Sequence, residues 1–253
     1  MSALRVALAQ LAWTGDHRSM GDRLERAVRE ASGLGARLTA FAELCTTPYF
    51  CAEREGGRDQ AYEPIPGGPT VRRMSALAEE LGMVLVVPLA ELGADDRRYN
   101  SAAVIDADGT LAGTYRKRHL PNGPGAWEQD RFHPGEGGPA VFPTVIGRVG
   151  VALCWDRFFL DTWEAVGRER ARLTVVPIAS GRRSPAPEAT IVQTSMARSH
   201  SMFVATVNRV GAPDFPGGSY VAAPSGAVLG AFGSDHEELV VRDLDLREAR
   251  RPS

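Results

Sequence analysis

Three residues of this sequence combine a nucleophile, a base and a cation. Glu43, Lys117 and Cys154 each follow a short run of apolar residues. Such runs are typical of buried strands, and ligands of open α/β sheets gather at the carboxyl ends of strands. A thiol placed there attacks a carbonyl carbon when a carboxylate takes its proton and an ammonium stabilises the oxyanion. The three residue types therefore point to amide hydrolysis.

Other interpretations of these residues stay open at this stage. A lone cysteine is most often an inert core residue, and the basic run 116–118 could be a solvated strand end. A cysteine nucleophile could also use a histidine base, and His119 is the one histidine at a comparable strand end. A serine nucleophile is not favoured, because the sequence contains no G-x-S-x-G motif.

The elements that must position these residues alternate between strands and helices. The opening of the chain predicts a strand at 4–9, a helix from a Ser19/Asp22 capping box to Gly33, and a strand at 38–42. This order builds parallel strand pairs. The later patterns predict helix 70–81, strand 83–89, a hairpin of 101–106 with 110–115, strands 140–145 and 149–153, helix 161–171, strand 173–177, helix 188–199, strand 202–207, hairpin 218–231 and strand 238–243.

The connections between these elements include two long loops. Residues 46–69 are rich in Pro, Gly and charge, and residues 120–139 are too rich in Gly and Pro for regular structure. Residues 181–187 form a further breaker cluster with two arginines. We expect all three segments to line the pocket. No linker divides the chain, so we expect one α/β domain over residues 1–253, with two mixed sheets and the helices outside.

Composition excludes several classes of partner. The chain has 253 residues and a net charge of −2 with both signs interleaved, which argues against a nucleic-acid partner. No apolar run approaches the roughly 20 residues that cross a bilayer, so we expect no membrane partner. Three cysteines are a sparse and odd set, which favours a reducing, cytoplasmic location. The five histidines lack metal-binding spacing, so we expect no metal and no other cofactor, and a small molecule as substrate.

Three ordered segments resemble the catalytic blocks of the nitrilase superfamily of carbon–nitrogen hydrolases. They are F-A-E-L at 41–44, Y-R-K-R-H-L-P at 115–121 and G-V-A-L-C-W-D at 150–156. Residues 208–211 and 217–226 are similar to late segments of the same family, so the resemblance covers nearly the whole chain. It implies an α-β-β-α sandwich of two mixed sheets. It also implies a homodimer or higher homo-oligomer, because dimers of the family form an αββα-αββα core.

The resemblance assigns roles by matching position. Glu43 would be the general base, Lys117 the cation for the oxyanion, and Cys154 the nucleophile that forms a thioester-type intermediate. Glu128 resembles the second glutamate that many members place beside the base, although an exposed loop acid is the alternative. The backbone amide of Trp155 would complete the oxyanion hole.

The substrate depends on a finer resemblance. The run 116–128 with F-H-P-G-E at 132–136 is most similar to the N-carbamoylputrescine amidohydrolase branch. Arg157 departs from that branch and resembles the N-carbamoyl-D-amino-acid hydrolases, where an arginine grips a substrate carboxylate. A solvent-exposed arginine is the alternative. An aliphatic or ω-amidase, a member that transfers the acyl group to another acceptor, and a non-enzymatic binding module also stay open.

Overall fold

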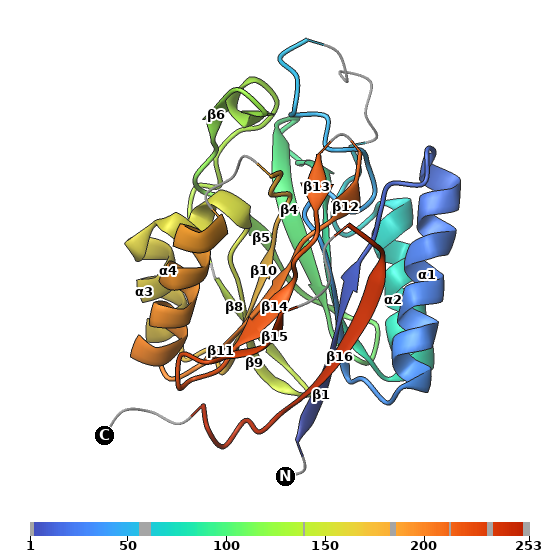
Figure 1. The fold of residues 1–253 in the computed structure, drawn as a ribbon. Coiled ribbons are helices and arrows are strands. Elements are labelled where there is room, and N and C mark those ends of the chain that lie inside the picture. The colour runs from blue at the N-terminus through green and yellow to red at the C-terminus, as the bar shows by residue number, and fades with distance from the viewer. Residues whose placement is uncertain are drawn as a thin grey trace.

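The computed structural model describes residues 3–55, 62–138, 140–182, 186–212, 214–231 and 235–249. In this part of the chain two six-stranded sheets pack face to face, and a pair of helices covers the outer face of each sheet (Figure 1). The layers therefore run helix, sheet, sheet, helix. The predicted α-β-β-α sandwich of two mixed sheets is confirmed.

The first sheet has the strand order β16-β1-β2-β3-β4-β5. Strands β1, β2 and β3 are parallel, and the other neighbours are antiparallel. Helices α1 and α2 pack their apolar faces on its outer side, where Leu24, Val28 and Met74 are buried. The elements are β1 (Leu4–Gln10), α1 (His17–Gly33), β2 (Leu38–Phe41), α2 (Pro69–Leu81), β3 (Val84–Leu92), β4 (Arg98–Ile105), β5 (Leu111–Arg116) and β16 (Glu238–Leu244).

The second sheet has the order β15-β14-β11-β10-β9-β8, with β9, β10 and β11 parallel. Helices α3 and α4 cover its outer side (Figure 1). Two short strand pairs, β6 with β7 and β12 with β13, lie outside both sheets. The elements are β6 (Asn122–Gly123), β7 (Ala126–Trp127), β8 (Val141–Thr144), β9 (Gly147–Val151), α3 (Leu160–Arg168), β10 (Leu173–Pro177), α4 (Ala186–Ser199), β11 (Phe203–Val207), β12 (Val210–Gly211), β13 (Phe215–Pro216), β14 (Tyr220–Ala222) and β15 (Val228–Ala231).

The main core lies between the two sheets. Val6, Val86, Val151 and Val175 are fully buried in one cluster there. Each such side chain contributes about 1.5–3 kcal/mol when it is removed from water. Strands β2 and β5 run in the same direction, because β3 is parallel to β2 and two antiparallel pairings separate β3 from β5. The residues that follow β2 and β5 therefore emerge at the same end of the sheet.

Several predicted boundaries are wrong. Helix α1 begins at His17 and is capped by Asp16, whose Oδ1 accepts the Ser19 amide at 2.9 Å, so the predicted Ser19 cap lies one turn too late. The predicted helix 161–171 ends at Arg168, before Arg170 adopts a φ of 62°. Helix α4 begins inside the predicted breaker segment, since proline is tolerated in a first helical turn. Residues 183–185 of that segment lie outside the described residues.

The loop 120–139 has more regular structure than predicted. It contains β6, β7 and a 3-10 turn at Glu128–Asp130. Gly125 adopts a φ of 85°, which closes the tight turn between the two strands. The glycines that suggested an irregular loop are instead the residues that permit a hairpin.

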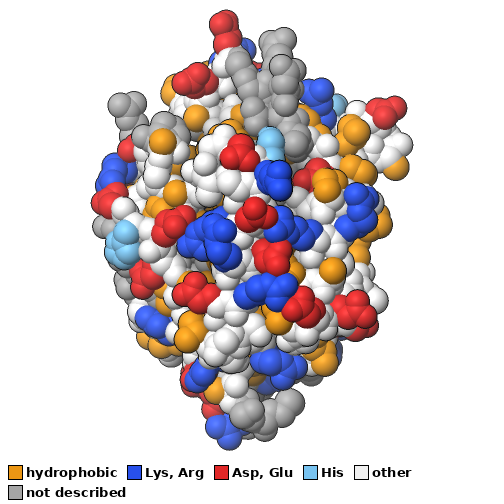
Figure 2. Space-filling model, turned by 90° about the vertical axis from the view of Figure 1, so that its right-hand side faces the viewer, with side chains coloured by type: hydrophobic (Ala, Val, Ile, Leu, Met, Phe, Trp, Pro, Cys, Tyr) orange, Lys and Arg blue, Asp and Glu red, His pale blue; other side chains and the backbone are white. Residues whose placement is uncertain are grey.

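The face that α1 and α2 present to solvent carries both signs of charge. Figure 2 shows basic and acidic side chains interleaved over it. Arg73 pairs with Asp22 and Glu25, and Arg29 pairs with Glu25 and Glu80. Among the side chains described on this face, no basic patch extends across it. No helix in the described part of the chain is long and apolar enough to cross a bilayer.

Candidate active site

Glu43, Lys117 and Glu128 meet in a buried cluster, although 74 residues separate the first two. Lys117 Nζ lies 2.7 Å from Glu43 Oε1 and 2.7 Å from both carboxylate oxygens of Glu128. All three side chains have 0% exposure. Lys117 is therefore not part of a solvated strand end, and Glu128 is not an exposed loop acid.

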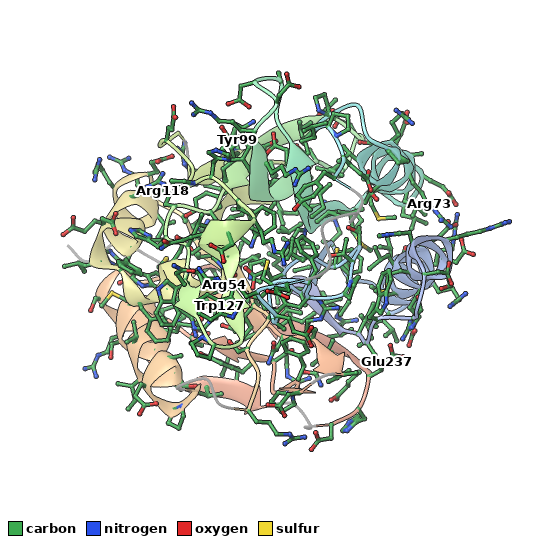
Figure 3. All side chains as sticks on the ribbon, turned by 90° about the horizontal axis from the view of Figure 1, so that it is seen from above. Arg54, Arg73, Tyr99, Arg118, Trp127 and Glu237 are labelled. Atoms are coloured by element: carbon green, nitrogen blue, oxygen red, sulfur yellow. The ribbon has the colours of Figure 1, made fainter. Side chains whose placement is uncertain are left out.

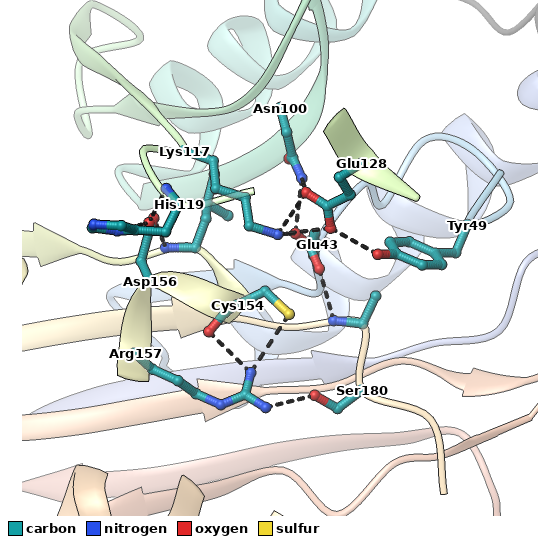
Figure 4. A network of polar contacts seen from close by, with 12 residues as sticks. Glu43, Tyr49, Asn100, Lys117, His119, Glu128, Cys154, Asp156, Arg157 and Ser180 are labelled. Carbon is teal, nitrogen blue, oxygen red and sulfur yellow. Dashed lines mark hydrogen bonds and ion pairs between the residues drawn. The ribbon is translucent and has the colours of Figure 1, made fainter. Parts of the chain in front are cut away.

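Two polar residues that the sequence did not single out complete this cluster. Asn100 on β4 donates to Glu43 Oε1 at 2.8 Å and to Glu128 Oε2 at 3.3 Å. The Tyr49 hydroxyl donates to Glu128 Oε1 at 2.7 Å. The backbone amide of Ala179 donates to Glu43 Oε2 at 3.0 Å. The carboxylates are thus held by donors from four separate segments (Figure 4).

Burial and charge set the proton affinities of this cluster. Burial lowers the pKa of the Lys117 ammonium, but the charges of Glu128 and Glu43 outweigh it, and the net pKa lies well above its ordinary value. Burial raises the pKa of the Glu128 carboxyl to about 7, against the opposing effect of Lys117. Lys117 therefore stays charged, while Glu128 changes its charge near neutral pH.

Cys154 lies three residues beyond the end of β9, in a strained turn. Its φ is 46°, a region that only a few per cent of non-glycine residues adopt, and it begins the 3-10 turn Cys154–Phe158. Such strain persists where the surroundings impose it, which is common at active sites. Burial raises the pKa of the Cys154 thiol to about 11, and the charge of Glu43 adds to the rise. The resting thiol is therefore protonated and needs a base.

Asp156 fixes the turn that carries Cys154. This buried carboxylate accepts five hydrogen bonds, from the Tyr115 hydroxyl, the Leu153, Arg118 and His119 amides, and the His119 ring. Four of these donors come from Tyr115, Arg118 and His119, which flank Lys117 in sequence. The hydrogen bond that the His119 ring donates to Asp156 also raises the pKa of His119. His119 is thus an ion-pair partner of Asp156, and its ring lies stacked 3.7 Å from that of Phe159.

Arg157 is buried beside Cys154. Its side chain is 2% exposed, so a solvent-exposed arginine is the wrong interpretation. Nη1 lies 3.1 Å from the Cys154 carbonyl oxygen and 3.5 Å from Sγ, and Nη2 donates to Ser180 Oγ at 2.8 Å.

Trp155, the next residue after Cys154, is half-buried with its ring 4.9 Å from that of Phe158.

Arg157 also lines a pocket of about 300 Å³. The other polar side chains around this pocket come from the ends of β10 and β11, from α4 and from β14. They belong to Ser180, Arg182, Thr190, Gln193, Asn208 and Tyr220. None of the described lining residues is an aspartate or glutamate. Arg182 pairs with Asp214 and Asp235, so Arg157 supplies the remaining positive charge among the lining residues that the structure describes.

The two long loops are tied to each other next to Glu128. The Trp127 amide donates to the Cys51 carbonyl at 2.8 Å. The Arg54 guanidinium lies 5.0 Å from the Trp127 ring and pairs with Asp130 at 3.1 Å. Seen from above, Arg54 and Trp127 lie together near the middle of the molecule (Figure 3). These contacts order the segment that delivers Glu128. A separate hollow of about 990 Å³ borders His119 and Gln129. Neither this hollow nor the pocket beside Arg157 is lined by Cys154 or by the cluster carboxylates.

A family profile for carbon–nitrogen hydrolases matches residues 5–251. The chain belongs to the carbon–nitrogen hydrolase family. As a carbon–nitrogen hydrolase it is 35% identical, over 95% of its length and 86% of the relative, to an N-carbamoylputrescine amidase of Solanum lycopersicum. It is 31% identical to a citrullinase of Francisella tularensis, over 74% of this chain and 65% of that one.

A solved structure supports the enzyme class of this carbon–nitrogen hydrolase. The protein is 27% identical to an amidase of the nitrilase superfamily from Nesterenkonia, with a TM-score of 0.80 over 98% of this chain and 92% of that one. In that structure the acetamide moiety of fluoroacetamide is attached to the active-site cysteine. The predicted nitrilase-superfamily membership is confirmed. Among the described residues no group of three or more His, Cys, Asp or Glu side chains is placed to hold a metal.

Proposed function

We propose that this hydrolase cleaves N-carbamoyl amines with Cys154 as nucleophile. The observation that carries the proposal is the meeting of Glu43 and Lys117 at 2.7 Å in a site without solvent exposure, beside a thiol held in a strained turn. A non-enzymatic binding module would not need this arrangement, because buried like charges and backbone strain lower stability.

The proposed chemistry balances over two steps. Cys154 Sγ attacks the carbamoyl carbon while Glu43 accepts the thiol proton, and Lys117 with the Trp155 amide stabilises the oxyanion. The bond to the terminal nitrogen breaks, and Glu43 returns the proton as ammonia leaves. Water activated by Glu43 then attacks the thiocarbamate on Sγ. The released carbamate breaks down to carbon dioxide and a free amine.

Glu128 holds Lys117 in place in this scheme. Both of its oxygens contact Lys117, and Tyr49 and Asn100 orient the same carboxylate. An ammonium fixed in this way needs little reorganisation when the oxyanion forms, which is the main source of electrostatic catalysis.

N-carbamoylputrescine is the first candidate substrate. The support is the named relative at 35% identity, together with the motif around Lys117 and Glu128. A carboxylate-bearing N-carbamoyl compound is the second candidate, and the pocket favours it. Arg157 lines that pocket and no described lining residue is acidic, so a substrate carboxylate would find a cation while an ammonium would find no carboxylate.

The experiment is a side-by-side assay of ammonia release. N-carbamoylputrescine, an N-carbamoyl amino acid and a simple aliphatic amide are compared by kcat/KM, with Cys154→Ala as the blank. Higher kcat/KM for the amine supports the first candidate, and higher kcat/KM for the acid supports the second. Turnover of the simple amide alone would overturn the N-carbamoyl proposal in favour of an aliphatic or ω-amidase. Faster release in the presence of hydroxylamine would indicate acyl transfer to an acceptor other than water.

We also propose a homodimer, with α3 and α4 at the interface. Leu160 and Ile191 on these helices are 59% and 66% exposed, which is unusual for large apolar side chains. Light scattering at two concentrations tests this, and a monomeric mass at both would contradict it.

A cytoplasmic location stays our proposal, supported by three unpaired cysteines.

A further inference from the structure

Two cations act on the Cys154 sulfur: the charges of Lys117 and Arg157 both lower the pKa of its thiol. Lys117 Nζ lies 2.7 Å from three carboxylate oxygens of Glu43 and Glu128, which accounts for the three donors of an ammonium. Arg157 is the cation that contacts Sγ among the described residues, at 3.5 Å from Nη1 (Figure 4). The nucleophile therefore has a cationic neighbour of its own.

The Arg157 guanidinium is fixed in this position. Nη2 donates to Ser180 Oγ at 2.8 Å, and the Ser180 amide donates to Asn208 Oδ1 at 3.0 Å. The Trp163 indole donates to the Arg157 carbonyl at 2.8 Å, and the guanidinium lies 4.8 Å from the Phe158 ring. Arg157 is therefore held at its backbone carbonyl, at Nη2 and at the face of its guanidinium, and these contacts fix its orientation.

The charge balance of the site makes a second cation favourable. With both glutamates ionised, Glu43, Glu128 and Lys117 together carry one negative charge. Moving the thiol proton to Glu43 makes these three residues neutral together and places one negative charge on sulfur, so the total that includes Cys154 stays at one negative charge. A buried, uncompensated negative charge is costly, and Arg157 brings the total to zero.

We propose that Arg157 is a further catalytic residue, whose guanidinium stabilises the Cys154 thiolate directly. The S–H bond breaks, the proton moves to Glu43, and the electron pair stays on sulfur facing Nη1. The same thiolate is the leaving group when water cleaves the thiocarbamate, so Arg157 acts in both steps. The catalytic role of Arg157 rests on the proposed function. Its stabilisation of the thiolate, however, is a property of the protein without substrate.

The test is alkylation of Cys154 by iodoacetamide without substrate, followed by mass spectrometry of the modified peptide between pH 6.5 and 9.5. An opposite charge within about 4–6 Å changes a pKa by about 1–3 pH units. Arg157→Gln should therefore slow alkylation about 10- to 1,000-fold at each pH below the thiol pKa. Arg157→Lys, which keeps the charge, should recover at least part of this loss. Arg168→Gln, on the exposed end of α3, is the matched control and should alkylate at the wild-type rate.

The outcomes separate this inference from the proposed function. An unchanged alkylation rate in Arg157→Gln overturns the inference, and a selective rise in KM for carboxylate substrates would then show that the arginine serves recognition only. Slow alkylation supports the inference even if no N-carbamoyl compound is hydrolysed, because the measurement needs no substrate. If the glutamine variant does not fold, Arg157→Met, which fills a similar volume without charge, takes its place.

Discussion

Asp156 accepts the backbone amide of His119 at 2.8 Å, which fastens the turn that carries Cys154 to the strand end that carries Lys117. The two segments follow strands of different sheets, β9 for Cys154 and β5 for Lys117. The carboxylate between them spans the layers of the sandwich, since its other oxygen accepts the Tyr115 hydroxyl of β5 at 2.8 Å and the Leu153 amide at 3.2 Å. Asp156 is thus a positioning residue for the pair.

Asp156→Asn should lower both stability and turnover. An amide cannot accept all five hydrogen bonds, and we expect a loss of about 2–4 kcal/mol in the free energy of unfolding. We expect kcat to fall about 10-fold or more because Lys117 and Cys154 lose their fixed separation. Urea unfolding and steady-state kinetics measure these effects. Asp161→Asn is the control, because its side chain is 60% exposed and its contact with His119 should contribute less than about 1 kcal/mol. Equal behaviour of the two variants would contradict the positioning role.

Cys154→Ala should abolish turnover and leave the fold intact. The residue is the proposed nucleophile, and we expect a loss of about 10³-fold or more in kcat/KM. Circular dichroism and ammonia release are the measurements. Cys45→Ala provides the comparison, because Cys45 is also buried and unpaired but donates to the Pro88 carbonyl away from the cluster. Substantial turnover by Cys154→Ala would refute the nucleophile assignment.

Glu128 should make the stability of the protein depend on pH below neutrality. Burial raises its pKa from 4.5 to about 7. Between these values the folded protein holds a proton that the unfolded chain has released. The contribution of Glu128 therefore favours folding at low pH and is lost as the pH rises through this window.

Glu128→Gln removes this titration. As the pH rises from 4.5 to 7, the free energy of unfolding of the wild type should fall relative to that of the variant. The fall should be at most about 1.4 kcal/mol per pH unit. Urea unfolding at four pH values provides the measurement. Asp108→Asn is the control, because a hydrogen bond from Thr110 lowers the pKa of Asp108 below 3.8. A wild-type profile parallel to that of Glu128→Gln would rule out a raised pKa for Glu128.

Tyr49→Phe should lower the stability of the protein without removing a charged side chain from the cluster of Glu43, Lys117 and Glu128. The variant removes the 2.7 Å hydrogen bond to Glu128, and we expect a loss of about 1–3 kcal/mol because the carboxylate oxygen stays buried. The loss of this donor should raise the pKa of Glu128 further. Thermal unfolding and the pH profile of kcat test both effects. Tyr99→Phe is the matched control, since its hydroxyl contacts the 45% exposed Asp95. No difference between the two variants would argue against a role for Tyr49.

The sequence by itself was sufficient to predict the family, the α-β-β-α sandwich and the candidate chemistry. Apolar runs ending at Glu43, Lys117 and Cys154 encode strands, and strand ends in such a sheet define one edge of the molecule. These are local signals, carried by residue type and short-range periodicity. Local signals failed where a tertiary or turn contact decided the structure, as at the Asp16 cap of α1 and the Gly125 hairpin.

Only the tertiary structure decided which partners surround the reactive groups. Tyr49 and Asn100 reach Glu128 across separations of 79 and 28 residues, and nothing in their local sequence marks them. Arg157 was visible as a substrate-gripping candidate, yet its burial and its 3.5 Å contact with Sγ depend on Ser180, 23 residues away. Burial and distances of this kind arise when whole layers pack, because a side chain's solvation and electrostatic environment are set by every segment that covers it.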